Sequence, residues 1–115
     1  ANPDMLGHTG VIDATVSGLK TIDECLKRIV EAVDNNFYKL IITADHGNCD
    51  EMIRKDGSIS TTHSTYPVPF ILRDKRVSLK HKGDLTEIAP TILKYMDIAI
   101  PKEMKETKTL FVEED

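Results

Sequence analysis

With 115 residues, 40% of them hydrophobic, the chain is long enough to form the core of one small domain. Its 30% of charged residues predict solubility, and a net charge of −4 with scattered basic residues argues against a nucleic-acid-binding protein. No apolar run approaches the roughly 20 residues that a transmembrane helix needs, and the polar, glycine-rich start has no signal-peptide pattern.

Two further features of the sequence bear on its context. Cys25 and Cys49 make no disulfide framework, so they favour reduced thiols in a cytosolic protein. The sequence has no initiator methionine and opens directly into a motif-like segment. We therefore expect a C-terminal piece of a longer protein, whose other part could hold a targeting segment, another domain or half of a site.

The N-terminal third predicts a loop followed by a long helix. Pro3, Gly7 and Gly10 punctuate residues 1–10 and indicate a loop. Apolar residues then recur at helical spacing up to the turn cluster at residues 34–36, with charged residues on the other faces. The apolar positions are Ile12, Val16, Leu19, Ile22, Leu26, Ile29, Val30 and Val33.

Two short apolar runs predict strands. Residues 38–43 are bounded by turn residues and indicate a buried strand, which we expect in a parallel sheet. Residues 66–72 form the second run, and its prolines place it at a sheet edge or make its start irregular. Between the runs, Asp56 and Gly57 are typical of a hairpin turn.

The C-terminal third predicts a second helix. Asp84 and Glu87 have capping-box spacing, and an apolar face follows them up to Met96. Pro90 would disrupt a helix interior, so it marks either a kink or a later start of the helix. The last residues of the charged tail are expected to be loose. Helix, strand, strand and helix together indicate an α/β fold, a layered sheet with flanking helices.

Three polar clusters lie in predicted loops or at strand ends, where α/β sheets bind their ligands. They are Asp4 with His8, Asp45 with His46, and His63. Taken alone, each cluster is better explained by an ordinary turn, because Asp and Asn bond bent backbone locally. The fourth histidine, His81, has basic neighbours and is interpreted as plain surface.

Taken together, the three clusters suit metal binding. Imidazole and carboxylate ligands favour zinc, manganese, iron or magnesium, and the two cysteines lack zinc-finger spacing. Two aspartates and three histidines are too many for one four-coordinate site with an open position, but they fit a share of two sites. A pair of metal ions can bind a phosphoryl group and activate an oxygen nucleophile.

Four segments also carry a family resemblance. NPDMLGHTG, TADHGN, THSTYPVPFIL and GDLTEIAPTILKYMDI followed by Pro101 occur in this order. Together they resemble the C-terminal part of the cofactor-independent (2,3-bisphosphoglycerate-independent) phosphoglycerate mutases of the alkaline phosphatase superfamily. TADHG alone would indicate only an alkaline phosphatase-like metalloenzyme, and NPDM with GHTG adds the mutase. Cys49, where the family usually has a small residue, and a closing segment without the expected glycine depart from the pattern.

The resemblance implies that residues 1–115 are the C-terminal portion of a phosphatase-like metal-binding domain. It implies two manganese ions, with magnesium, cobalt or zinc as alternatives, and no other cofactor. Asp4, His8 and His63 would bind the first ion, and Asp45 and His46 the second. The nucleophilic serine, a further aspartate and the substrate domain would lie outside this sequence, so no residue here is expected to be catalytic.

The implied function is that of an isomerase. The parent enzyme would interconvert 3-phosphoglycerate and 2-phosphoglycerate in glycolysis through a phosphoserine intermediate, in the cytoplasm, as a monomer whose partner is its small-molecule substrate. The isolated chain is expected to be inactive. Two alternatives stay open: a related metal-dependent phosphopentomutase, phosphatase or sulfatase, and a non-catalytic, truncated metal-binding scaffold.

Overall fold

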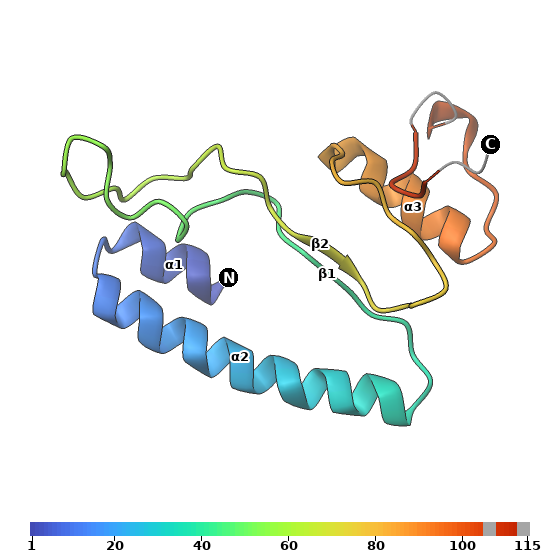
Figure 1. Ribbon diagram of the computed structural model, residues 1–115, viewed down its shortest axis with the longest axis horizontal. Coiled ribbons are helices and arrows are strands. Elements are labelled where there is room, and N and C mark those ends of the chain that lie inside the picture. Colours follow the sequence, from blue (N-terminus) through green and yellow to red (C-terminus); the bar gives the residue numbers. More distant parts are fainter. Residues whose placement is uncertain (105–107, 113–115) are drawn as a thin grey trace. The chain divides into compact units, whose positions relative to one another are not determined.

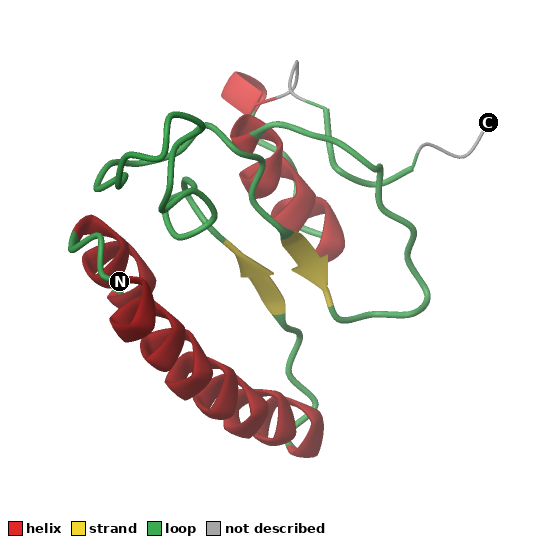
Figure 2. Cartoon of the chain, turned by 60° about the vertical axis from the view of Figure 1, so that its left-hand side comes forward, coloured by secondary structure: helices red, strands yellow, loops and turns green. Residues whose placement is uncertain are grey.

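The first 36 residues form two helices that pack against each other. The computed structural model describes residues 1–104 and 108–112, with α1 at Asn2–His8 and α2 at Ile12–Asn35 (Figure 1). Gly10, with φ of 68°, makes the turn between them in a backbone conformation that favours glycine. Leu6 of α1 packs over Gly18 of α2, where a Cβ would overlap with the leucine side chain. Figure 2 shows α1 alongside the first turns of α2.

The loop predicted for residues 1–10 is wrong, because Asn2–His8 is helical. Pro3 lies in the first turn, where a backbone N–H has no partner within the helix and a proline is tolerated. Gly7 is buried inside the helix and lies against the side chain of Asn48. Proline and glycine each disfavour a helix when considered alone, but the positions of Pro3 and Gly7 in α1 accommodate both.

The long helix predicted after residue 11 is confirmed. It ends where the turn cluster predicts, and the side-chain Nδ2 of Asn36 donates a hydrogen bond of 2.8 Å to the carbonyl of Ala32. Phe37 follows with φ of 58°, so the chain leaves the helical path.

Two short strands follow, β1 at Ile41–Thr43 and β2 at Phe70–Leu72. They pair antiparallel, with Ile42 opposite Ile71, so the parallel pairing expected from the apolar run is not found within the residues that the structure describes. β2 starts only after Pro69, as its prolines predict. The hairpin is confirmed by an antiparallel bridge between Ile53 and Ile59 around Gly57, whose φ is 85°.

A bidentate ion pair connects the end of α2 to the residue after β2. Arg73 donates hydrogen bonds of 2.9 Å and 2.8 Å to the two carboxylate oxygens of Asp34. These bonds lower the pKa of Asp34 below its ordinary value of 3.8, against the opposing effect of desolvation. The pair therefore joins α2 to the sheet mainly while Asp34 is ionised.

This ion pair predicts a pH dependence of stability. Because the pKa is lower in the folded state, the stabilisation is complete above pH 3.8 and is lost as the pH falls through that lower pKa. Thermal melts of the wild type and of Asp34→Asn should differ at neutral pH and converge at about pH 2. A difference in melting temperature that stayed constant over this range would contradict the prediction.

Residues 74–115 form a second compact unit. Its helices are η1 at Leu85–Glu87, α3 at Ile88–Tyr95 and η2 at Lys102–Met104. The predicted capping box is confirmed, since Asp84 accepts from the N–H of Thr86 at 2.9 Å and Glu87 accepts from the N–H of Asp84 at 2.6 Å. Pro90 lies in the first turn of α3, which supports the later helix start.

Thr91 connects α3 to the C-terminal segment. Its side chain is 0% exposed, donates to the carbonyl of Glu87 at 2.6 Å and accepts from the N–H of Leu110 at 2.8 Å. Leu110 is itself only 7% exposed, and among the residues that the structure describes it is the large hydrophobic residue with the buried side chain. The threonine hydroxyl therefore satisfies a backbone donor that has no access to water.

We expect Thr91→Val to lower the free energy of unfolding by about 1–3 kcal/mol, because the buried N–H of Leu110 loses its acceptor. Urea denaturation measures this loss. Thr15→Val is the matched control: Thr15 is 1% exposed, but its hydroxyl only donates to the carbonyl of Val11, which also accepts the backbone N–H of Thr15. Equal losses in the two variants would contradict the role given to the Thr91 hydroxyl.

Helices with a short antiparallel sheet agree with the α/β class, while the layered sheet stays a prediction. Within residues 1–104 and 108–112, no helix is long and apolar enough to cross a membrane. The expectation of a loose tail falls on residues 113–115, which lie outside the described residues.

Candidate metal centre

Three segments of the N-terminal unit bring the predicted ligands together. Asp4 and His8 lie one turn apart on the same face of α1. The loop after β1 carries His46, and the segment after the hairpin carries His63. The N–H of Ser64 donates to the carbonyl of Gly47 at 2.8 Å, and this backbone bridge places the two histidines side by side.

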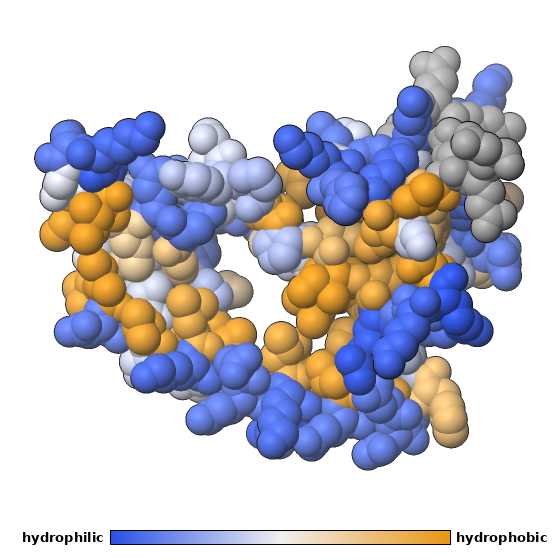
Figure 3. Space-filling view, in the orientation of Figure 1, coloured by the Kyte–Doolittle hydropathy of each residue, from blue (hydrophilic) through white to orange (hydrophobic). Residues whose placement is uncertain are grey.

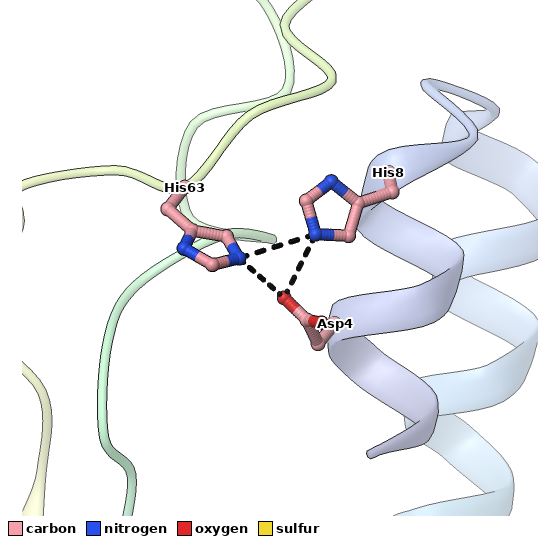
Figure 4. Close-up of side chains that lie close together, drawn as sticks. All are labelled: Asp4, His8 and His63. Carbon is pink, nitrogen blue, oxygen red and sulfur yellow. Dashed lines mark hydrogen bonds and ion pairs between the residues drawn. The ribbon is translucent and has the colours of Figure 1, made fainter.

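Asp4, His8 and His63 form a nearly equilateral triangle of ligand atoms (Figure 4). Oδ1 of Asp4 lies 3.2 Å from Nε2 of His8 and 3.1 Å from Nε2 of His63. The two Nε2 atoms are 3.2 Å apart. Each side chain points toward the other two, although His63 is more than 50 positions away from the others in sequence.

The size of the triangle suits a small divalent ion. Bonds of about 2.1 Å hold neighbouring ligand atoms about 3.0 Å apart in an octahedron and about 3.4 Å apart in a tetrahedron. The three separations of 3.1 to 3.2 Å lie between these limits. One carboxylate oxygen and two imidazole nitrogens are also a ligand set that zinc, manganese or iron accepts.

A backbone contact indicates which nitrogen of His8 carries its proton. Nδ1 lies 2.6 Å from the carbonyl oxygen of Thr61. A carbonyl can only accept, so Nδ1 must be the donor, and in the neutral ring Nε2 then presents its lone pair. That lone pair faces the Asp4 carboxylate, which is also an acceptor. Two acceptors this close require a proton or a cation between them.

Asp4 is held in its charged form. Its pKa is lowered below 3.8, first by the hydrogen bond from the Asn48 side chain and then by the three nearby histidines, with desolvation opposing them. Nδ2 of Asn48 donates to Oδ1 of Asp4 at 3.0 Å. Asp4 therefore supplies negative charge to the triangle at neutral pH.

The second predicted pair borders the triangle. The ring of His46 stacks on that of His63, with centroids 3.6 Å apart and planes 18° apart. Nε2 of His46 lies 3.6 Å from Oδ1 of Asp45 and 3.8 Å from Oδ1 of Asp4. The Asp45 side chain is 87% exposed. The pair supplies two ligand atoms, fewer than a four-coordinate ion needs.

Residues 1–100 match the family model of the Metalloenzyme superfamily. The chain belongs to this superfamily. It is 50% identical over 106 residues to a protein of Lawsonia intracellularis and 49% identical over 115 residues to one of Clostridium novyi. A protein of Flavobacterium johnsoniae is 46% identical over 104 residues. All three are named 2,3-bisphosphoglycerate-independent phosphoglycerate mutase, which confirms the resemblance found in the sequence.

The matched segments cover 90% to 96% of this chain but 21% or 22% of the three relatives. The chain thus spans about a fifth of the length of the curated relatives it matches. A metal-binding role agrees with membership of the Metalloenzyme superfamily. The relatives are isomerases by name.

Two contacts of this superfamily member were missed from the sequence. Asn48 belongs to the TADHGN segment, but a pattern of metal ligands includes only its aspartate and histidine. Thr61 acts through its backbone carbonyl, which no side-chain pattern identifies. A search for amides beside the acidic and histidine residues would have found Asn48, whereas only the folded structure shows the Thr61 contact.

Proposed function

We propose that this chain supplies metal ligands of a cofactor-independent phosphoglycerate mutase. Asp4, His8 and His63 hold one divalent ion, and Asp45 and His46 are part of the site of a second. The observation that carries the proposal is the triangle of Asp4 Oδ1, His8 Nε2 and His63 Nε2, whose separations of 3.1 to 3.2 Å fit neighbouring ligands of one small divalent ion. A cation bound by all three atoms would offset the charge of the Asp4 carboxylate.

Manganese is the ion that we propose, with magnesium, cobalt or zinc as alternatives. Bound at these sites, the ions would offset the negative charge of a phosphoryl group during its transfer. Within this chain, the Asp4 carboxylate and the Nε2 atoms of His8 and His63 bind and orient. His8 keeps its Nδ1 proton on the carbonyl of Thr61, so it serves as a ligand and not as an acid or base.

The proposed reaction interconverts 3-phosphoglycerate and 2-phosphoglycerate through a phosphoserine. The serine and the substrate contacts come from residues outside this chain, since none of its serines matches the family's nucleophile motif. The shared name of the relatives favours the mutase over a phosphopentomutase, phosphatase or sulfatase. The free thiols of Cys25 and Cys49 support a cytoplasmic location.

Apolar surface supports a role as part of a larger domain. Large hydrophobic side chains at the start of α2 and along it are 41% to 52% exposed; they are Val11, Ile12, Val16, Leu19 and Ile29. Figure 3 shows hydrophobic residues along the upper edge of this helix and hydrophilic residues along its lower edge. Several exposed apolar side chains on one helix are typical of an element that packs against more protein. We propose that the remainder of a monomeric mutase covers it, and that no nucleic acid or membrane is involved.

A chimera tests the proposal. This chain would replace the matched segment of the Clostridium novyi mutase, with which it aligns over 115 residues. With manganese, the chimera should interconvert the two phosphoglycerates, whereas the isolated chain should not. The same chimera with Asp4→Ala is the control and should be inactive while remaining folded by circular dichroism. Turnover by the isolated chain, or full activity of the Asp4→Ala chimera, would overturn the proposal.

A further inference from the structure

One buried amide connects the two elements that carry the proposed ligands. Asn48 is 7% exposed and lies in the loop after β1, next to the Asp45 and His46 pair. Its Nδ2 reaches α1 and donates to Oδ1 of Asp4 at 3.0 Å and to the backbone carbonyl of Asp4 at 3.3 Å. The amide nitrogen of Asn48 therefore contacts two acceptors of a single residue.

Helix α1 is shaped to receive this amide. A Cβ on Gly7 would overlap with Oδ1 and Cγ of Asn48. Glycine is a poor residue for a helix interior because it loses much backbone entropy on folding. Its presence one turn after Asp4 leaves the space that the Asn48 side chain occupies, so the helix accepts an unfavourable residue where the amide fits.

The oxygen that Asn48 contacts is also the one that faces the histidines. Oδ1 of Asp4 lies 3.1 Å from His63 Nε2 and 3.2 Å from His8 Nε2. A carboxylate oxygen has two lone-pair directions, so one hydrogen bond to Asn48 leaves the other direction for an ion. The hydrogen bond also fixes the rotation of the carboxylate.

A neighbouring contact shows that the amide is not required merely to hold the loop. Sγ of Cys49 donates to the carbonyl of Pro3 at 2.8 Å, so the same loop has a second attachment to the same helix. The Cys49 contact involves only backbone of α1, whereas Asn48 contacts the carboxylate itself. The two residues can therefore be separated by mutation.

We propose that Asn48 is a positioning residue, whose hydrogen bond holds Oδ1 of Asp4 toward His8 and His63 and thereby sets the metal affinity of this triangle. The inference rests on the proposed metal-binding function. It assigns Asn48 a role in orienting a ligand and not in contacting the ion. Partners of this kind typically contribute 10- to 100-fold in affinity.

Calorimetric titration of the full 115-residue chain with Mn²⁺ tests this role. Asn48→Ala and Asn48→Leu should each weaken binding at the triangle by about 10- to 100-fold. Leucine restores the volume of the side chain but not its donor. Cys49→Ala is the matched control and should bind like the wild type. Melts without metal check that each variant is folded.

A double-mutant cycle distinguishes an effect of Asn48 through the orientation of Asp4 from a general stabilising effect on the site. If Asn48 acts through Asp4, Asn48→Ala should cause no further loss of affinity in an Asp4→Ala background. Additive losses, or wild-type affinity in Asn48→Leu, would overturn the inference while leaving the metal site itself in place. A wild-type chain that bound no Mn²⁺ would overturn the metal site and this inference with it.

Discussion

Asp4→Ala should strongly weaken binding at the triangle, lowering its affinity for Mn²⁺ by more than about 100-fold, since even residues that only orient a ligand contribute 10- to 100-fold. The substitution removes the one charged ligand of the three. It also removes the group that both Nε2 atoms face at 3.1 and 3.2 Å. Two neutral imidazoles alone would remain to hold a divalent cation.

Site-by-site metal counts measure this effect. His63→Ala should impair the same ion as Asp4→Ala, whereas Asp45→Ala should spare it, because the Asp45 carboxylate is 87% exposed and lies 3.6 Å from Nε2 of His46. Anomalous scattering from crystals grown with manganese identifies which position is lost. Loss of the triangle's ion in Asp45→Ala, or its full retention in Asp4→Ala, would contradict the assignment of ligands to two ions.

Elements fixed by local chemistry were predictable from the sequence. The long helix follows from apolar periodicity, and the capping box of Asp84 and Glu87 from side chains three residues apart. Helix α1 was missed because Pro3 and Gly7 indicate a break when considered alone. The helix tolerates Pro3 because this residue lies in the first turn. It tolerates Gly7 because the space beside this residue holds the side chain of Asn48, which is more than 40 residues away in the sequence.

The candidate site was predictable in its members but not in its arrangement. Residue chemistry indicated Asp4, His8, Asp45, His46 and His63, and the family resemblance grouped Asp4, His8 and His63 on one ion. In the part of the chain that the structure describes, the ligand atoms of these three lie close together. The proximity itself arises from long-range backbone contacts, such as the bridge between Gly47 and Ser64. Strand pairing was likewise beyond the sequence, since an apolar run does not specify whether its neighbour is parallel or antiparallel.

Acid should release the metal through the histidines. An imidazole must be neutral to bind an ion, because a proton and a metal ion compete for the same nitrogen lone pair. With two imidazole ligands, the affinity should therefore fall as the pH falls. Asp4 adds nothing to this decline near neutral pH, because its lowered pKa keeps the carboxylate ionised there. Mn²⁺ titrations at a series of pH values measure the fall.

The slope of that fall reports the number of histidines on the ion. Where protons compete with the ion for both imidazoles, the wild type should lose about 100-fold in affinity for each pH unit, and His63→Ala about tenfold, since one imidazole remains. His81→Gln is the matched control, because this exposed histidine is outside the triangle and should leave the slope unchanged. A wild-type slope of tenfold per unit would mean that only one of His8 and His63 binds the ion, and the triangle would no longer describe the site.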